Sequence, residues 1–253
     1  MKLKIKFTSA AFAITLLTMA GTAEAAFLSS TAWLDIASLT WETVSGDAQL
    51  IWGSENHNAE SLAGDFGGAL SNQSQNGSTP VSTNLVFSGS GIAYADAYSS
   101  ETLVQTSVID SGTAMAIATL ERNYSISGSG SVLLRLNYFI NQEVTDLTND
   151  FSFANANVQF LDTLGGDQAT AFNQILGFDV KGAPNNGNYS FTEDGTLELS
   201  LNNLSDGNEG SLVFLAYGNV ENEEVEMEAV PEPAIALLLG PGLIALISRR
   251  RKV

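Results

Sequence analysis

The chain has 253 residues, 44% of them hydrophobic, and a formal net charge of −18. It contains no cysteine, which excludes disulfides, cysteine-based zinc sites and thiol nucleophiles. Residues 26–230 hold 26 acidic residues and three basic ones, a net charge of −23, which argues against nucleic acid or anionic lipid as a partner of this part.

The N-terminus has the pattern of a secretory signal peptide. Three lysines among the first six residues precede an apolar run over 7–19, and Ala23 and Ala25 lie directly before Ala26. A basic start, a short apolar stretch and a small-residue site are typical of a cleaved signal, and a run of about 13 residues is short for a bilayer span. We therefore predict that residues 1–25 are removed on export, with Ala23, Ala25 and Ala26 marking the cleavage site.

The middle of the chain, residues 26–220, is predicted to be one β-sandwich domain. Apolar residues alternate with polar ones over 120–126 and again over 132–140. This two-residue period indicates strands with one apolar face. The Ser-Gly-Ser-Gly sequence at 127–130 predicts a turn between them, so a hairpin is expected over about 114–140.

Further strands are predicted along the domain, with few segments of another kind. Segment 54–80, rich in Ser, Asn, Gln and Gly, is predicted to be a long loop, and apolar spacing over 168–177 predicts a short helix. Many strands joined by small polar turns favour an all-β, antiparallel two-sheet sandwich of jelly-roll-like topology. A closed sheet and a right-handed β-helix are the alternatives, although no fixed-period repeat supports the β-helix. The other expected strands are Trp33–Val44, Gln49–Trp52, Asn84–Tyr98, Leu103–Ile109, Phe151–Leu161, Tyr189–Thr192, Leu197–Leu201 and Leu212–Val220.

The C-terminus combines four parts in order. Residues 221–230 form an acidic linker, Pro231-Glu232-Pro233 follows, 234–247 is apolar throughout, and Arg249-Arg250-Arg251 lies near the end. As a helix, the apolar run would be about 21 Å long, against a hydrocarbon core of about 30 Å. Snorkelling arginines and local thinning of the bilayer accommodate so short a transmembrane helix. The basic cluster would then remain cytoplasmic and the acidic domain would lie outside.

This tail resembles the PEP-CTERM sorting signal of exported proteins in Gram-negative bacteria. The matching residues are Pro231, Glu232 and Pro233, the apolar run 234–247, and Arg249, Arg250 and Arg251. The resemblance covers only residues 231–253. It implies recognition by an exosortase, a membrane-embedded peptidase that removes or exchanges the tail, and a host that makes exopolysaccharide. It implies no activity for the middle of the chain.

The middle offers few candidates for chemistry. His57, the only histidine, is predicted to be a solvated loop residue, because no nucleophile motif accompanies it and a catalytic zinc usually takes two or three histidines. Trp33 and Trp41 would share one face of a straight strand, where they either stack on sugar rings or pack in the core.

A turn near the end of the domain has calcium-like chemistry. Asp206, Asn208 and Glu209 offer the oxygen ligands that calcium takes, although they do not fit the EF-hand pattern. An ordinary acidic turn is the alternative, and no other cofactor is expected.

These features predict a non-enzymatic exported protein of the cell envelope, surface or extracellular matrix. Its expected partners are an exosortase and, through the helix 234–247, the membrane. The first alternative is a carbohydrate-binding module of the exopolysaccharide matrix, which exposed aromatic side chains would favour. The second is a glycosidase, which two facing carboxylates in a cleft would favour.

Overall fold

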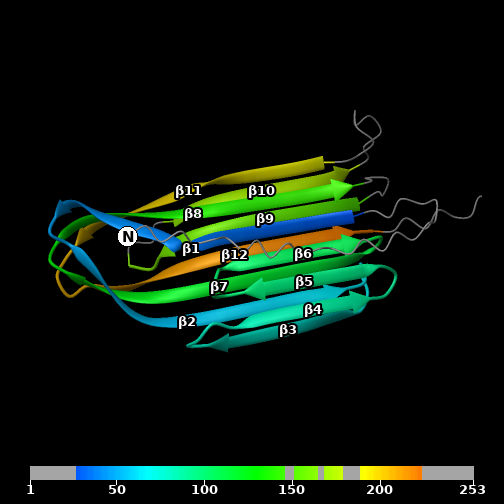
Figure 1. The fold of residues 1–253 in the computed structure, drawn as a ribbon, viewed down its shortest axis with the longest axis horizontal. Coiled ribbons are helices and arrows are strands. Elements are labelled where there is room, and N and C mark those ends of the chain that lie inside the picture. Colours follow the sequence, from blue (N-terminus) through cyan, green and yellow to red (C-terminus); the bar gives the residue numbers. More distant parts are fainter. Residues whose placement is uncertain (1–26, 146–150, 165–167, 179–188, 224–253) are drawn as a thin grey trace, which may run out of the picture.

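The computed structural model describes residues 27–145, 151–164, 168–178 and 189–223, which form an all-β structure of two antiparallel sheets, as predicted (Figure 1). Sheet A has the strand order β11-β8-β1-β6-β5-β4, and sheet B has the order β10-β9-β12-β7-β2-β3. In this part of the chain no helix is long and apolar enough to cross a membrane. The strands are β1 (Phe27–Gly46), β2 (Gln49–Gly64), β3 (Leu70–Gly77), β4 (Ser82–Ser88), β5 (Ile92–Tyr98), β6 (Leu103–Ile109), β7 (Gly112–Ser127), β8 (Gly130–Thr145), β9 (Phe151–Asp162), β10 (Gln168–Phe178), β11 (Tyr189–Leu204) and β12 (Glu209–Asn222).

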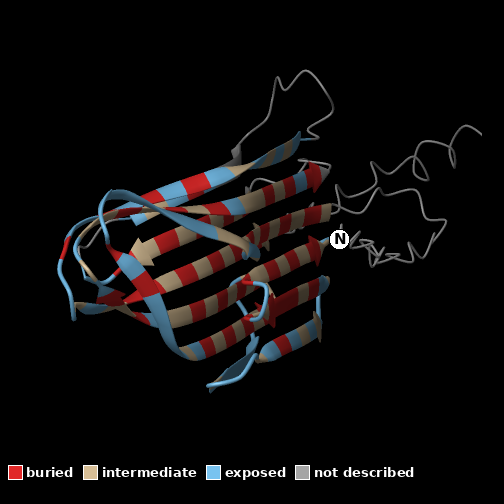
Figure 2. Ribbon diagram, turned by 60° about the vertical axis from the view of Figure 1, so that its left-hand side comes forward, coloured by how far each residue is buried: buried red, intermediate tan, exposed pale blue. Residues whose placement is uncertain are grey.

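The core lies between the two sheets and is built from alternate residues of the central strands. Figure 2 shows buried residues alternating with less buried ones along these strands. In sheet B, Phe160 and Phe214 are fully buried and stack with ring centroids 5.0 Å apart. Ala95 of β5 and Ala116 of β7 are fully buried too, and such small side chains allow facing strands to pack closely. Packing of this kind holds the sheets together in a chain that has no cysteine for a disulfide.

The strands predicted over 114–140 are present, but the hairpin prediction is wrong. β7 pairs with β2 and β12 in sheet B, whereas β8 pairs with β1 and β11 in sheet A. The turn at 127–130 therefore carries the chain from one sheet to the other. A hairpin and such an arch have the same alternation of apolar residues, so the pattern predicts the strands but not their partners.

Three such arches lie together at one end of the sandwich, called the arch end below (Figure 1). They are the connections over 46–49, 127–130 and 204–209, which join β1 to β2, β7 to β8 and β11 to β12. Hydrogen bonds link one arch to the next: the Asp47 N–H donates to Ser129 O at 2.9 Å, and the Gly128 N–H donates to Asp206 Oδ1 at 3.0 Å. The arches thus support one another.

Segment 54–80 is not a long loop. Its first part completes β2, and Leu70–Gly77 forms β3, an edge strand that pairs with β2. The residues of β3 are nearly all exposed and polar, so main-chain pairing rather than burial places the strand. No apolar period could therefore predict it.

The helix predicted over 168–177 is also wrong, because this segment is β10, paired with β9. Ala171 is buried while the neighbouring Phe172 is 52% exposed. Adjacent residues thus point to opposite faces, as in a strand. Pairing with β9 overrides the helical spacing of the apolar residues.

The described chain begins and ends at the same end of the sandwich, opposite the arch end. Phe27 pairs with Ile109, and Asn222 pairs with Gly112 a few residues further along the chain. The Asn222 side chain also donates a hydrogen bond to Asp110 O. The predicted signal peptide, sorting motif and apolar helix lie outside the described residues, and β12 continues two residues into the predicted linker.

Candidate functional site

Near the arch end, sheet A does not fully cover the inner face of sheet B. β6 pairs with β1 only over Phe27–Trp33, and β5 and β4 follow with equally short strands. β1 continues to Gly46, paired with β8 on one side. Figure 2 shows the arch-end segments of β1 and β2 as exposed. Trp52, which pairs with the buried Tyr124 on the inner face, is therefore 36% exposed.

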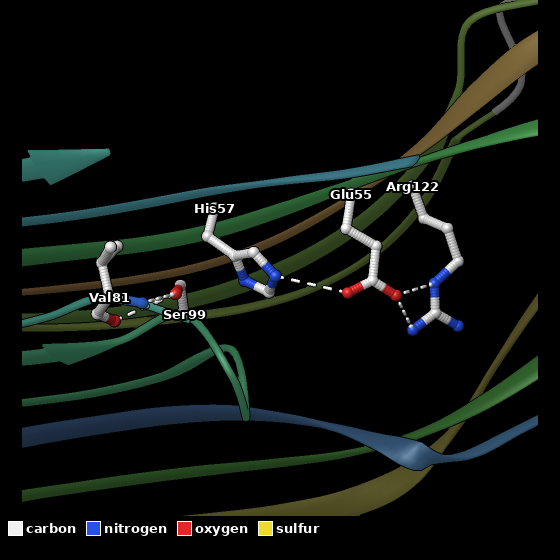
Figure 3. A network of polar contacts seen from close by, with 5 residues as sticks. All are labelled: Glu55, His57, Val81, Ser99 and Arg122. Carbon is white, nitrogen blue, oxygen red and sulfur yellow. Dashed lines mark hydrogen bonds and ion pairs between the residues drawn. The ribbon is translucent and has the colours of Figure 1, made fainter. Parts of the chain in front are cut away.

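A polar network lies on the inner face of β2 and β7 at this opening (Figure 3). Arg122 donates to Glu55 Oε1 through Nε at 2.7 Å and approaches the same oxygen through Nη2 at 2.5 Å. The other carboxylate oxygen, Oε2, lies 3.3 Å from His57 Nε2. The Arg122 guanidinium is also 5.4 Å from the centre of the Trp52 ring, a cation–π contact. One partly exposed carboxylate thus connects a buried histidine to an arginine.

His57 is buried, at 2% exposure, which corrects the prediction of a solvated loop residue. It lies in β2 opposite the buried Leu120. Neither ring nitrogen has a hydrogen-bond partner, because the contact with Glu55 at 3.3 Å lacks hydrogen-bond geometry. In Figure 3 His57 lies between Glu55 and Ser99, but the Ser99 hydroxyl exchanges two 2.9 Å hydrogen bonds with the main chain of Val81. That hydroxyl is held by the backbone, so it does not form a Ser–His nucleophile pair.

The outer face of sheet A carries two adjacent rows of side chains that differ in chemistry. In each row, neighbouring strands contribute residues that lie directly opposite one another. At about 4.8 Å between strands, four residues in a row span about 14 Å. The aromatic row is Phe139, Trp33, Leu103 and Tyr98, and the polar row, two residues further along each strand, is Asn141, Thr31, Gln105, Asp96 and Asn84.

Asp96 is the most buried member of the polar row, at 1% exposure. Its carboxylate accepts hydrogen bonds from the Tyr94 hydroxyl, from the Tyr98 hydroxyl at 3.1 Å and from Asn84 Nδ2 at 2.6 Å. Burial, together with this carboxylate, raises the pKa of Tyr94 and of Tyr98. Both hydroxyls therefore remain donors, and their bonds to Asp96 fix the orientation of the two rings. Strict alternation with alanine over 93–98 is the sequence signal that marks this face.

A bulge separates the two tryptophans that were predicted to share a face. The register of β1 against β8 shifts between Asp35 and Thr40. Trp33 pairs with Phe139 on the outer face, whereas Trp41 pairs with the buried Leu134 on the inner face and is 37% exposed. The prediction is wrong because β1 has three more residues than β8 between these two pairs, and an odd number of extra residues reverses the alternation of a strand.

The predicted calcium ligands lie in the arch between β11 and β12. Asp206 Oδ1 accepts the Gly128 N–H at 3.0 Å, and Asn208 Oδ1 accepts the Ser205 N–H at 2.8 Å. One oxygen of each side chain therefore holds the turn, while Glu209 begins β12. Across the described ranges, no three His, Asp or Glu side chains are grouped as a metal site. Calcium binding at Asp206, Asn208 and Glu209 stays a prediction.

Comparison with known proteins does not identify the class of this protein. Protein families, curated proteins and solved structures were all searched, and none matches this chain.

Proposed function

We propose that this is an exported, non-enzymatic protein of the cell surface or extracellular matrix, brought to the membrane by its C-terminal tail and processed there by an exosortase. The observation that carries the proposal is the position of the two ends of the described chain. Phe27 and Asn222 both lie at the end of the sandwich opposite the arches. A signal peptide and a sorting tail would therefore attach at one end of the body.

This arrangement would orient the β-sandwich, called the body below, relative to the membrane. With the tail in the membrane, the arch end would be the part furthest from it, at the far end of strands about 50 Å long. The acidic linker 221–230 would keep the body away from the membrane, because its glutamates repel one another and anionic headgroups. Both outer sheet faces would then be open to the surroundings. We also propose that the connectivity is jelly-roll-like, because the chain passes repeatedly between the two sheets.

No residue is assigned to catalysis. Among the residues whose burial the structure describes, the buried carboxylates are Asp96 and Asp162. Both accept hydrogen bonds from tyrosine hydroxyls, and the bond to Asp162 comes from Tyr124 at 2.6 Å. Such contacts suit carboxylates that fix the positions of neighbouring side chains. They support a structural or binding role over the carboxylate-based glycosidase.

The test is to follow the tail of the protein in a host that carries an exosortase. Pro231, Glu232 and Pro233 are replaced together by alanine, and a second variant ends at residue 230. Intact-mass spectrometry and cell fractionation report processing and location. We expect the wild-type product to lack residues 1–25 and the tail, the triple variant to keep its tail in the membrane fraction, and the truncated variant to be released unprocessed at its C-terminus.

The matched control is Pro80→Ala, which changes a proline outside the tail and should be processed like the wild type. The proposal is overturned if the mature wild-type protein retains residues 231–253 away from the membrane, or if the triple variant is processed normally.

A further inference from the structure

We infer that the outer face of sheet A binds an uncharged polysaccharide chain, which lies across the strands on the aromatic row and is hydrogen-bonded by the polar row. This inference rests on the matrix role proposed above, and it adds the class of ligand that the protein would bind there. Binding itself is a property of the folded body, so it is measured separately from sorting.

The aromatic row supplies the apolar half of such a site. Trp33 lies at its centre, directly between Phe139 on β8 and Leu103 on β6, with Tyr98 next on β5. The ring faces of a sugar carry C–H groups, which pack on aromatic side chains, and Trp and Tyr provide large areas for this contact. These four side chains are half-buried on the outside of the sheet, so each keeps part of its surface open to a ligand.

The polar row supplies hydrogen-bonding groups at the matching place. Thr31, Gln105 and Asn141 are half-buried on β1, β6 and β8, about 7 Å along the strands from the aromatic row. Amide and hydroxyl side chains both donate and accept, as the hydroxyls of a sugar do. Asn84 of β4 donates a hydrogen bond to Asp96 of β5, and this bond joins the two strands at one end of the row.

The charge on this face argues against an anionic ligand. Asp35, Glu143 and Asp194 project from β1, β8 and β11 on the same face as Trp33. The neighbouring Arg135 is held between Glu42 at 2.8 Å and Glu198 at 2.7 Å. Anionic polysaccharide, nucleic acid and anionic lipid would be repelled, and a second copy of the chain docked face to face would bring like charges together. A neutral polyhydroxylated chain is not repelled by these acidic side chains.

The experiment measures migration of the full-length protein in native gels that contain one polysaccharide each. Dextran, galactomannan, xylan and a mixed-linkage β-glucan are the uncharged probes, and alginate is the anionic one. We expect at least one uncharged probe to retard the protein and alginate to have no effect. Trp33→Ala should weaken the retardation by about tenfold or more, the loss expected for removing a central aromatic contact, and Tyr98→Ala, at the end of the row, should weaken it by a smaller factor.

Two further variants separate binding from folding. Trp33→Phe keeps an aromatic ring and should retain more binding than Trp33→Ala, while thermal unfolding confirms that both variants fold. Trp41→Ala is the matched control, since Trp41 lies on the inner face of the same strand, and it should bind like the wild type. Sorting variants should bind normally, so a failure of the sorting proposal leaves this result unaffected.

Three results would overturn the inference. The first is that no uncharged probe retards the wild-type protein. The second is that folded Trp33→Ala and Tyr98→Ala bind as well as the wild type. The third is a self-associated protein in sedimentation analysis that Trp33→Ala disperses, because the face would then be an interface between copies.

Discussion

Gly46 of β1 pairs with Gly130 of β8 at the point where both strands leave sheet A for an arch. Both residues have positive φ, +73° and +138°. A Cβ on Gly46 would lie 2.0 Å from Ser129 O, and one on Gly130 would lie 1.9 Å from Ser45 O. Two neighbouring arches therefore approach at a place that has no room for a side chain.

The first prediction is that Gly130→Ala destabilises the protein by about 3 kcal/mol or more, because backbone strain and a clash with main-chain atoms act together. Urea unfolding followed by circular dichroism measures the change. The matched control is Gly207→Ala, which also has a positive φ, +78°, but meets no atom within 4 Å. It should lose only about 1 kcal/mol from backbone strain. Equal losses in the two variants would contradict the close approach of the arches.

The second prediction concerns the side-chain bond that joins two arches. Asp47 Oδ1 accepts the Ser129 N–H at 2.9 Å, and Asp47→Ala should cost about 1 kcal/mol of the free energy of unfolding. Asp194→Ala is the charge-matched control, because it removes an exposed carboxylate from the edge strand β11. Removing a negative charge from so acidic a chain should make the control neutral or slightly stabilising. A stabilised Asp47→Ala protein would show that the arch bond contributes nothing.

The third prediction compares the two arginines of the described chain. Arg122 has a side chain 21% exposed, binds Glu55 and covers Trp52, so Arg122→Met should destabilise the protein by about 2 kcal/mol. Arg135→Met removes an arginine that is 39% exposed between Glu42 and Glu198, and should cost less than about 1 kcal/mol. Thermal unfolding at two salt concentrations measures both, and salt should weaken only the Arg135 contribution appreciably. A larger loss of stability in Arg135→Met than in Arg122→Met would contradict this ranking.

The sequence predicts the strands of this fold better than it predicts their partners. The alternation over 132–140 depends only on which residues face the core, and the structure confirms that strand. Pairing depends on contacts between distant segments, so the arch at 127–130 and the edge strand β3 could not be predicted locally. The bulge between Asp35 and Thr40 is likewise invisible in composition, and it decides which tryptophan reaches the outer face.

The same limit applies to the candidate sites. His57 follows a bulge in β2 and shares the inner face with Ala59 and Ser61, whose side chains are too small to give a clear apolar period, so its burial was missed. The two rows on sheet A exist only because five strands align in register. Trp33, Leu103 and Phe139 are far apart in the chain, and no local motif brings them together.

The last prediction is a loss of stability in alkali that depends on Tyr138. Burial, together with the hydrogen bond to Glu193, raises the pKa of Tyr138 from 10.0 to about 12 in the folded protein. The folded state then holds this proton more tightly than the unfolded state. The resulting stabilisation is complete below pH 10 and is lost as the pH rises from 10 to about 12. Tyr138→Phe has no proton to lose, so its unfolding temperature should fall less steeply than that of the wild type over this range.

Tyr189→Phe, at an exposed tyrosine of β11, is the matched control and should follow the wild-type curve. Absorbance at the phenolate band during the titration reports ionisation directly. Parallel stability curves for Tyr138→Phe and the wild type between pH 10 and 12 would show that Tyr138 does not hold its proton through the fold.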